Sequence, residues 1–279
     1  MSSLVLGSKK VYASLVAYDH HNTWIYARMG EFSSPLSGDL EAMVIAGSPF
    51  LAKRYGAVVS EQEFHAQCEG IIAQLKPRNV IFISSAAVYG LVEPNALPLN
   101  EESELAGLSG YALEKISFEQ KLKSLSEKCL GTNFTVLRVS GFYNCFDENR
   151  ENSLVDRLLK QNATGLNETF EIEHGGRQVR DFCDYSFLIE LIAQHRKARQ
   201  AGYEIFNVKT TNGFTIKELL SRLGSDAEIA FVPSQDRAIH SELSVDKLLC
   251  RVSDFGMDFE NHFIDKVDKF YRNLLEHHR

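Results

Sequence analysis

Short apolar runs rich in β-branched residues alternate with helix-like patterns along the chain, and this alternation constrains the fold more than any other feature. Such an order is typical of a parallel sheet with helices on its faces. We therefore expect an α/β fold, a Rossmann-like doubly wound parallel sheet with a smaller C-terminal substrate lobe. The expected strands are Ser3–Leu6, Thr23–Ala27, Ala42–Ala46, Asn79–Ile83, Phe134–Leu137 and Glu204–Val208.

Helix-like patterns occupy stretches between these strands. The clearest lies at residues 60–75, where apolar residues recur at helical spacing until Pro77 ends the pattern. Others begin near Lys10 and cover Tyr111–Glu127. No repeat or Pro-rich linker divides the chain, so the second lobe is expected to be interleaved with the first. The sheet domain is expected at residues 1–141 and about 177–210, and the substrate lobe at about 142–176 and 211–279.

Composition and charge exclude several classes of protein. Apolar residues make up 44% of the chain and charged residues 24%, the ordinary balance of a globular protein with a core. The formal net charge of −7 disfavours nucleic acid as a partner, because clustered Lys and Arg hold phosphate backbones. No apolar run approaches the roughly 20 residues that span a bilayer, and the N-terminus does not resemble a signal peptide. We therefore expect a cytoplasmic protein with no membrane partner.

The five cysteines are scattered and show no close spacing. They are expected to be free thiols in a reducing compartment. The histidine pairs at residues 20–21 and 277–278 have no carboxylate cluster beside them, and adjacent side chains point in different directions. No metal site is therefore expected.

Three polar residues point to a catalytic set. Ser85 follows the expected strand Asn79–Ile83, and in an open parallel sheet chemistry takes place just beyond the carboxyl ends of the strands. Tyr111 and Lys115 follow within one expected helix. Because they are four residues apart, their side chains share one helix face, about one turn from each other.

This trio can move a proton. A free phenol ionises near pH 10, and a neighbouring ammonium lowers that pKa, so Lys115 is expected to favour the phenolate of Tyr111. Tyr111 then removes a hydroxyl proton, or donates one to a carbonyl, while hydride moves to or from a nicotinamide. Ser85 is expected to hydrogen-bond the same substrate oxygen.

With these residues the chain resembles the extended short-chain dehydrogenase/reductase family, the NAD-dependent epimerase/dehydratases that modify nucleotide sugars. Further segments carry the resemblance beyond residue 79. They are Leu137-Arg-Val-Ser-Gly-Phe-Tyr143, Arg180-Asp-Phe182, Phe206-Asn-Val208, Arg237 and Leu243-Ser-Val-Asp-Lys-Leu248.

The resemblance implies a nucleotide-sugar substrate whose diphosphate contacts Arg180 and Arg237. Two guanidinium groups converging on a dianion make physical sense in an otherwise acidic protein. The alternative is that both arginines form surface ion pairs. The resemblance also implies a homodimer, formed by the helices at residues 60–75 and 111–127.

The expected cofactor loop departs from the family's Gly-x-x-Gly-x-x-Gly. Gly7 remains and Ser8 follows it, but Lys10 stands where the middle glycine lets the cofactor pyrophosphate approach the backbone. The helix N-terminus can still hold phosphate, with Lys10 adding charge. Alternatively, the Lys10 side chain blocks the site.

The adenosine half of the cofactor site is expected to be abbreviated. Ala27 stands in place of the family's ribose-binding acid, and Arg28 follows it. An arginine there suits a 2′-phosphate, so NADP(H) is slightly favoured over NAD(H). About 14 residues separate Arg28 from the next strand, too few for a strand-plus-helix crossover. The expected cofactor-binding residues are Gly7, Ser8, Lys10, Arg28, Ala46, Tyr111 and Lys115.

Ala86 and Ala87 narrow the reaction. Related sugar dehydratases carry an Asp-Glu pair there, and alanines cannot transfer protons, so dehydration is disfavoured. We expect a 4-ketosugar reductase, slightly favoured over a 4-epimerase. One alternative is a non-catalytic nucleotide- or metabolite-binding protein on the same scaffold, which Lys10 supports. Another is a reductase of a small carbonyl compound, which Arg180 and Arg237 disfavour.

Overall fold

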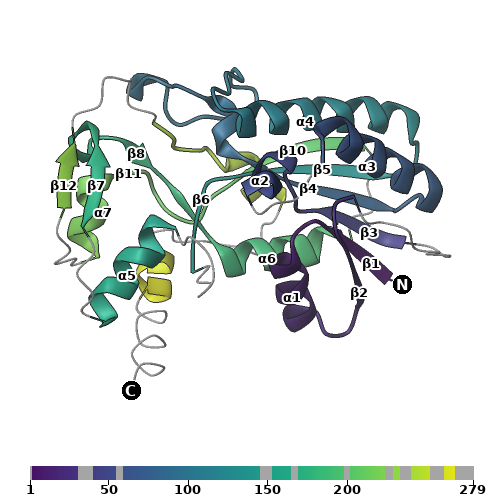
Figure 1. Cartoon of the computed structure of the whole chain (residues 1–279), viewed down its shortest axis with the longest axis horizontal. Coiled ribbons are helices and arrows are strands. Elements are labelled where there is room, and N and C mark those ends of the chain that lie inside the picture. The colour runs from purple at the N-terminus through teal and green to yellow at the C-terminus, as the bar shows by residue number, and fades with distance from the viewer. Residues whose placement is uncertain are drawn as a thin grey trace. The chain divides into compact units, whose positions relative to one another are not determined.

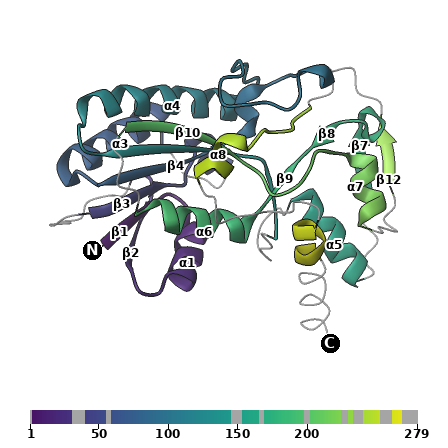
Figure 2. The same cartoon turned by 180° about the vertical axis from the view of Figure 1, so that it is seen from behind.

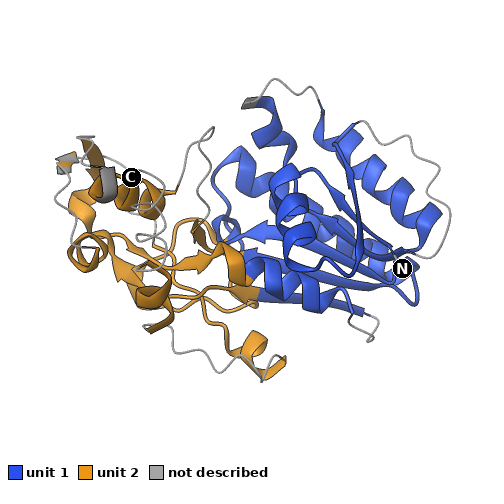
Figure 3. Cartoon of the chain, turned by 90° about the horizontal axis from the view of Figure 1, so that it is seen from below, with its two compact units in different colours: residues 1–88, 105–138, 188–206 blue, residues 89–104, 139–187, 207–279 orange. Residues whose placement is uncertain are grey.

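Contacts along the chain divide it into two compact units, each built from several segments (Figure 3). A computed structural model describes residues 2–30, 40–54, 59–144, 153–164, 169–197, 202–223, 229–232, 240–251 and 261–267. The first unit comprises residues 1–88, 105–138 and 188–206, and the second comprises residues 89–104, 139–187 and 207–279. Residues 89–104 and 177–187 therefore group with the second unit.

A parallel six-stranded sheet organises the first unit, which confirms the expected α/β class. The order across the sheet is β10–β5–β4–β3–β1–β2. Its strands are β1 (Ser2–Leu6), β2 (Thr23–Ala27), β3 (Leu40–Ile45), β4 (Asn79–Ser85), β5 (Asn133–Val139) and β10 (Gly202–Val208). Every expected strand is present. Continuous burial along β5 and most of β3 and β4 explains their uninterrupted apolar runs, because parallel strands are covered on both faces.

Helices cover both faces of this sheet (Figure 1, Figure 2). They are α1 (Lys9–Tyr18), α2 (Pro49–Arg54), α3 (Glu61–Leu75), α4 (Gly110–Lys128) and α6 (Tyr185–His195). The views place α3 and α4 on one face and α1 and α6 on the other. A capping box between Ser60 and Glu63 starts α3, and Lys76 ends it in the left-handed conformation before Pro77. Phe64, Phe82 and Phe118 pack together where α3 and α4 meet the sheet.

The strand order reverses beside β1, which pairs with β2 on one side and β3 on the other. In open α/β sheets, ligands bind at such a reversal, outside the carboxyl ends of the strands. The common dinucleotide-binding order has one more strand beyond the position of β2. Within the described ranges no strand pairs with that side of β2.

The described part of the second unit contains three two-stranded sheets and short helices around its own core. The strand pairs are β6 (Gly141–Tyr143) with β9 (Phe182–Asp184), β7 (Phe170–Glu173) with β12 (Ile229–Val232), and β8 (Val179–Arg180) with β11 (Phe214–Thr215). The helices are α5 (Leu154–Thr164), α7 (Ile216–Arg222) and α8 (Asp246–Arg251), and residues 261–267 are also helical. The described residues also form the single-turn 3₁₀ helices η1 (Ala86–Tyr89), η2 (Pro94–Ala96) and η3 (His174–Gly176).

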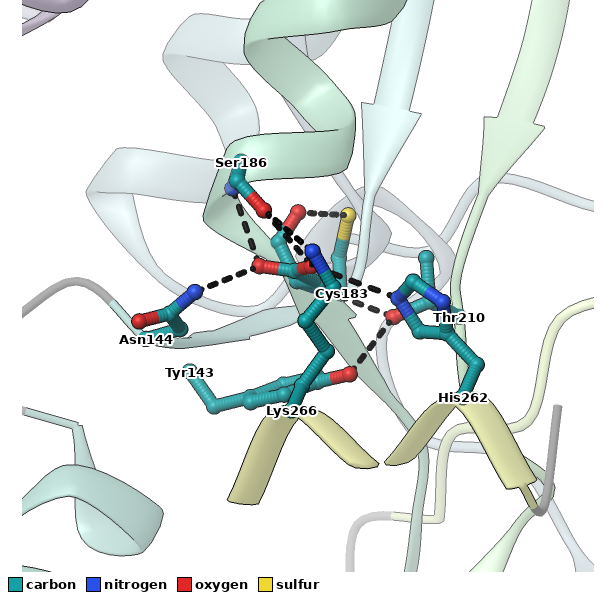
Figure 4. A network of polar contacts seen from close by, with 8 residues as sticks. Tyr143, Asn144, Cys183, Ser186, Thr210, His262 and Lys266 are labelled. Atoms are coloured by element: carbon teal, nitrogen blue, oxygen red, sulfur yellow. Dashed lines mark hydrogen bonds and ion pairs between the residues drawn. The ribbon is translucent and has the colours of Figure 1, made fainter. Parts of the chain in front are cut away.

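A buried carboxylate connects three segments of the second unit (Figure 4). Asp184 is fully buried, and its Oδ1 accepts hydrogen bonds from Asn144 Nδ2 (3.1 Å) and from the Ser186 backbone N–H (3.0 Å). Its Oδ2 accepts from Ser186 Oγ (2.7 Å) and lies 3.2 Å from both His262 Nε2 and Lys266 Nζ. Burial alone raises a carboxyl pKa, but these donors outweigh it and hold the pKa of Asp184 well below its usual value.

None of the helices in the described part of the chain is both long and apolar enough to cross a membrane. Among the described cysteines, Cys68, Cys129, Cys183 and Cys250 are free thiols.

Candidate active site

The three expected catalytic residues come together in the first unit. Ser85 is the last residue of β4, and Tyr111 lies in the first turn of α4, whose N-cap Ser109 accepts a hydrogen bond from the Ala112 N–H. A hydrogen bond joins the side chains of Ser85 and Tyr111. Ser85 Oγ also accepts from the Ala87 N–H at 3.2 Å, which fixes its position at the end of the strand.

Lys115 lies one turn after Tyr111 and is buried, with 4% of its surface exposed. Its Nζ donates hydrogen bonds to the carbonyl oxygens of Gly47 (3.0 Å) and Ile83 (2.9 Å). These carbonyls lie at the carboxyl ends of β3 and β4, so the ammonium is held at the edge of the sheet where ligands bind. The same Nζ lies 5.6 Å from the centre of the Tyr111 ring.

The pKa of Tyr111 differs from the sequence expectation. Burial raises it, the hydrogen bond with Ser85 lowers it, and the charge of Glu114 raises it; the net shift is upward. Burial also lowers the pKa of the Lys115 ammonium, to about 8, which leaves it mostly protonated at neutral pH. The structure therefore holds Tyr111 as a protonated phenol at neutral pH, ready to donate a proton.

The depressed pKa of Lys115 predicts a pH dependence of stability. Between about 8 and the ordinary value of 10.5, the unfolded chain binds a proton that the folded chain does not, so stability rises with pH. Lys115→Met removes this titration. We expect the wild type to gain on the order of 3 kcal/mol relative to the variant across that window, at about 1.4 kcal/mol per pH unit. Urea unfolding of both proteins from pH 7 to 10 measures the difference, and a constant difference would contradict the burial argument.

Glu114 connects α4 to the segment after β3. It is buried beside Lys115, and its Oε2 accepts a hydrogen bond from the Phe50 N–H at 2.6 Å, in the first turn of α2. The Phe50 ring lies 6.5 Å from the Tyr111 ring. It also packs over Gly110, where an added Cβ would come within 2.8 Å of the ring. Phe50 therefore forms part of the apolar surroundings of Tyr111.

The turn from β1 to α1 retains the features of a phosphate-binding turn. Gly7 has a φ of +104°, and a Cβ there would come within 2.9 Å of the Gly47 Cα, so glycine is required. Ser8 is the N-cap of α1, and its side chain accepts from the Val11 N–H at 3.2 Å. Lys10 lies in the first turn of that helix and is partly buried. The N-terminus of α1 thus points at the carboxyl edge of the sheet with a lysine in its first turn.

The ends of β2 and β3 hold the remaining expected cofactor residues. Arg28 follows β2 directly and is exposed, and the Ala46 N–H donates to the Leu6 carbonyl (3.0 Å) just after β3. The hydroxyl of Tyr26 donates to the Gly7 carbonyl at 3.3 Å, and its ring lies 5.5 Å from that of Tyr12. This aromatic pair borders the turn, and no motif in the sequence indicated it.

Arg180 belongs to the second unit, in the short strand β8. It is partly buried, and within the described residues its guanidinium forms no hydrogen bond or ion pair. Burial lowers its pKa, which the neighbouring Asp181 partly offsets. The pKa of His240 is lowered, mainly by burial and secondly by the charge of Arg180, which lies close to it. Arg237, the other expected diphosphate ligand, lies outside the described residues.

The chain is similar to known proteins in sequence and in fold. A family model described as "NAD dependent epimerase/dehydratase family" matches residues 68–208. A Methanocaldococcus jannaschii protein provisionally named UDP-glucose 4-epimerase is 30% identical over 146 residues. That match covers 50% of this chain and 44% of the relative, so the chain matches less than half of the relative's length.

Solved structures share the fold along nearly the whole chain. The dTDP-glucose 4,6-dehydratase DesIV of Streptomyces venezuelae, with NAD and TYD bound, is 17% identical with a TM-score of 0.74, covering 98% of this chain and 97% of its own. A UDP-N-acetylglucosamine 4-epimerase of Methanobrevibacter ruminantium, in complex with UDP-N-acetylmuramic acid, is 21% identical with a TM-score of 0.69, covering 99% and 96%. MoeE5 in complex with UDP-glucose and NAD is 17% identical with a TM-score of 0.70, covering 91% and 92%.

Proposed function

Because the chain belongs to the NAD dependent epimerase/dehydratase family, we propose that it is a nicotinamide-dependent oxidoreductase or epimerase acting on a nucleotide-linked sugar. The observation that carries the proposal is the meeting of Ser85, Tyr111 and Lys115 at the carboxyl ends of β3 and β4. The similar protein MoeE5 has been solved with NAD and UDP-glucose and with NAD and UDP-glucuronic acid, which supports this choice of cofactor and substrate.

The described residues fit a nicotinamide dinucleotide. The close approach of Gly7 to Gly47 leaves no side chain between β1 and β3 where the strand order reverses. In the proposal, Gly7, Ser8 and Lys10 hold the pyrophosphate at the N-terminus of α1. Ala46 lies beside this turn, and Lys115 and Tyr111 hold the nicotinamide half. Arg28 supports a 2′-phosphate, so NADP(H) is slightly favoured.

The proposed chemistry is proton transfer by Tyr111 at a sugar oxygen. Ser85 and Tyr111 both hydrogen-bond that oxygen, and Tyr111 donates its proton as the carbonyl becomes an alcohol. The bound nicotinamide supplies the hydride. Lys115, one turn away, stabilises the phenolate left on Tyr111 until solvent returns the proton.

Reduction of a 4-ketosugar is slightly favoured over 4-epimerisation. The raised pKa of Tyr111 supports a group that begins as an acid, which is the state that ketone reduction needs. An epimerase must begin by removing a proton from an alcohol, and must keep its cofactor through a full cycle. Lys10 in place of a motif glycine, and the short segment between Arg28 and β3, support a cofactor that exchanges in each turnover.

The Arg180 guanidinium is proposed to bind the substrate diphosphate. Arg180 is partly buried and has no acceptor among the described residues, so an anionic ligand would add roughly 1.5–3 kcal/mol per charge-assisted hydrogen bond. Arg180→Met keeps the length of the side chain and removes its donors, so we expect at least about a tenfold loss of affinity for a nucleotide sugar, measured by calorimetry. Dinucleotide affinity should not change.

Arg157→Met is a matched control for this experiment, since Arg157 is exposed on α5 with its guanidinium 4.7 Å from the Phe170 ring. It should bind the nucleotide sugar as the wild type does. If Arg180→Met also binds normally, the sugar nucleotide is the wrong substrate class, and reduction of an uncharged carbonyl compound becomes the better proposal.

We also propose a cytoplasmic homodimer formed through α3 and α4. On α4, Leu113 is 54% exposed, and an ion pair of 2.6 Å between Lys121 and Glu69 joins the two helices. A second copy packing on these helices would cover the leucine. Light scattering should give twice the 31.4 kDa of one chain at micromolar concentration, and the mass of a single chain would contradict the proposal.

A non-catalytic nucleotide-binding protein is the second candidate. Two observations favour it: Lys10 replaces a motif glycine, and the Tyr26 hydroxyl occupies the Gly7 carbonyl. Such a protein would bind nucleotide sugars without turning them over in the presence of NADH or NADPH.

A further inference from the structure

A buried ion pair lies directly behind the proposed catalytic residues in the first unit. Glu119 on α4 and Arg138 on β5 are 3% and 2% exposed, and Arg138 donates to Glu119 Oε2 from Nε at 3.1 Å and from Nη2 at 2.8 Å. The other oxygen, Glu119 Oε1, accepts a hydrogen bond of 2.5 Å from Ser84 Oγ. The Tyr203 hydroxyl donates to the Glu119 backbone carbonyl at 3.1 Å. The cluster thus ties α4 to three strands of the sheet, β4, β5 and β10.

The Glu119–Arg138 cluster is connected to the proposed catalytic residues through neighbouring positions in the sequence. Ser84 is the residue before Ser85, and Glu119 lies one helical turn after Lys115, which in turn follows Tyr111 by one turn. The Ser84–Glu119 hydrogen bond therefore fixes the end of β4 against the same helix that carries the phenol. It sets how Ser85 and Tyr111 lie relative to each other.

Stability alone does not explain such a cluster. Removing two charges from water costs about as much as their attraction returns, and apolar residues of similar size often stabilise a protein equally well. A satisfied polar network does, however, select a single arrangement of the elements that it joins. A catalytic pair needs that selectivity, because small displacements of reacting groups lower rates strongly.

We propose that Glu119, held by Arg138, is a positioning residue that orients Ser85 and Tyr111 through the hydroxyl of Ser84. This inference rests on the proposed function for its effect on turnover, but not for its effect on the geometry of Tyr111. Glu119 itself does not touch the substrate.

Ser84→Ala tests the link while leaving the ion pair in place. We expect kcat to fall about tenfold with KM nearly unchanged, and Ser84→Thr, which keeps the hydroxyl, to recover most of it. Ser3→Ala is the matched control. Ser3 is a fully buried serine of β1 whose Oγ accepts a hydrogen bond from Asn22 Nδ2 at 3.1 Å. The Ser3→Ala variant should therefore lose similar stability without losing kcat.

The double variant Glu119→Leu/Arg138→Met separates positioning from stability. It removes both charges together, so it avoids an unpaired buried charge and should remain folded with a similar melting temperature. We expect it to show the same tenfold loss of kcat as Ser84→Ala. A purely structural pair would leave kcat unchanged in a folded double variant, and that result would overturn the proposal.

A second readout does not depend on turnover. In protein labelled with 13Cζ-tyrosine, the Tyr111 signal is identified by its loss in Tyr111→Phe. We expect it to move in Ser84→Ala and in the double variant, and to stay in place in Ser3→Ala and Ser84→Thr. An unmoved signal in both test variants would overturn the proposal even if the wild type has no activity. If the wild type is inactive but the Tyr111 signal moves in the test variants, the proposed function is wrong and the positioning role is still supported.

Discussion

Tyr111→Phe should lower turnover by at least roughly a hundredfold while leaving the protein folded. General acid–base groups contribute about this much, and the substitution removes only the hydroxyl that carries the proton. The partly buried ring keeps its place beside the Phe50 ring, with the Lys115 Nζ 5.6 Å from its centre. Steady-state kinetics with reduced nicotinamide and a nucleotide-linked ketosugar measures the loss.

Tyr143→Phe is the control for this comparison. Tyr143 is also a buried tyrosine with a hydrogen-bonded hydroxyl, 3.2 Å from Thr210 Oγ1, but it belongs to the second unit. It should lose some stability and keep its turnover. Near-wild-type turnover in Tyr111→Phe would show that Tyr111 does not transfer the proton in the reaction.

Asp184→Asn should strongly destabilise the second unit. Every group that contacts the Asp184 carboxylate is a donor, and an asparagine must turn its own NH₂ toward some of them. Hydrogen bonds to a charged group contribute roughly 1.5–3 kcal/mol each, and His262 and Lys266 remain partly solvated, so we expect a loss of about 2–4 kcal/mol. Urea unfolding at pH 7 measures the free energy of unfolding.

The stability difference between the wild type and Asp184→Asn should depend on pH. The folded-state pKa of Asp184 is depressed, so its contribution is fully present above about pH 4, the ordinary value for Asp, and is lost as pH falls toward the folded pKa. The gap between wild type and Asp184→Asn should therefore narrow from pH 5 to pH 2. Asp246→Asn, at an exposed carboxylate in the same unit, should show little loss at any pH. A gap that does not change with pH would mean that the carboxylate is not the source of the stability.

The sheet of the first unit could be predicted because its strands are buried on both faces. Such strands give continuous apolar runs, and the expected Ala42–Ala46 differs from β3 only at its ends. The strands of the second unit have two to four residues, too short to show a period. The helix α6, apolar almost throughout, gave no amphipathic pattern to recognise.

The meeting of Ser85, Tyr111 and Lys115 could be predicted because these residues follow local rules: the end of a strand and a spacing of one helical turn. The direction of the Tyr111 pKa could not, because it depends on burial that only the folded chain provides. Charged residues in a helix usually face solvent, so Glu114 and Glu119 gave no sign of burial. Glu114 is one residue before Lys115 and Glu119 is four residues after it, so only Glu119 shares the helix face of Lys115.

Titration with NADPH and NADH, followed by the fluorescence of the reduced nicotinamide, tests the central claim most directly. Binding depends on the β1–α1 turn and on Lys115 together, and requires no knowledge of the sugar. We expect saturable binding of at least one of the two, slightly tighter for NADPH. A folded protein that binds neither would contradict the account of this chain as a nicotinamide-dependent enzyme.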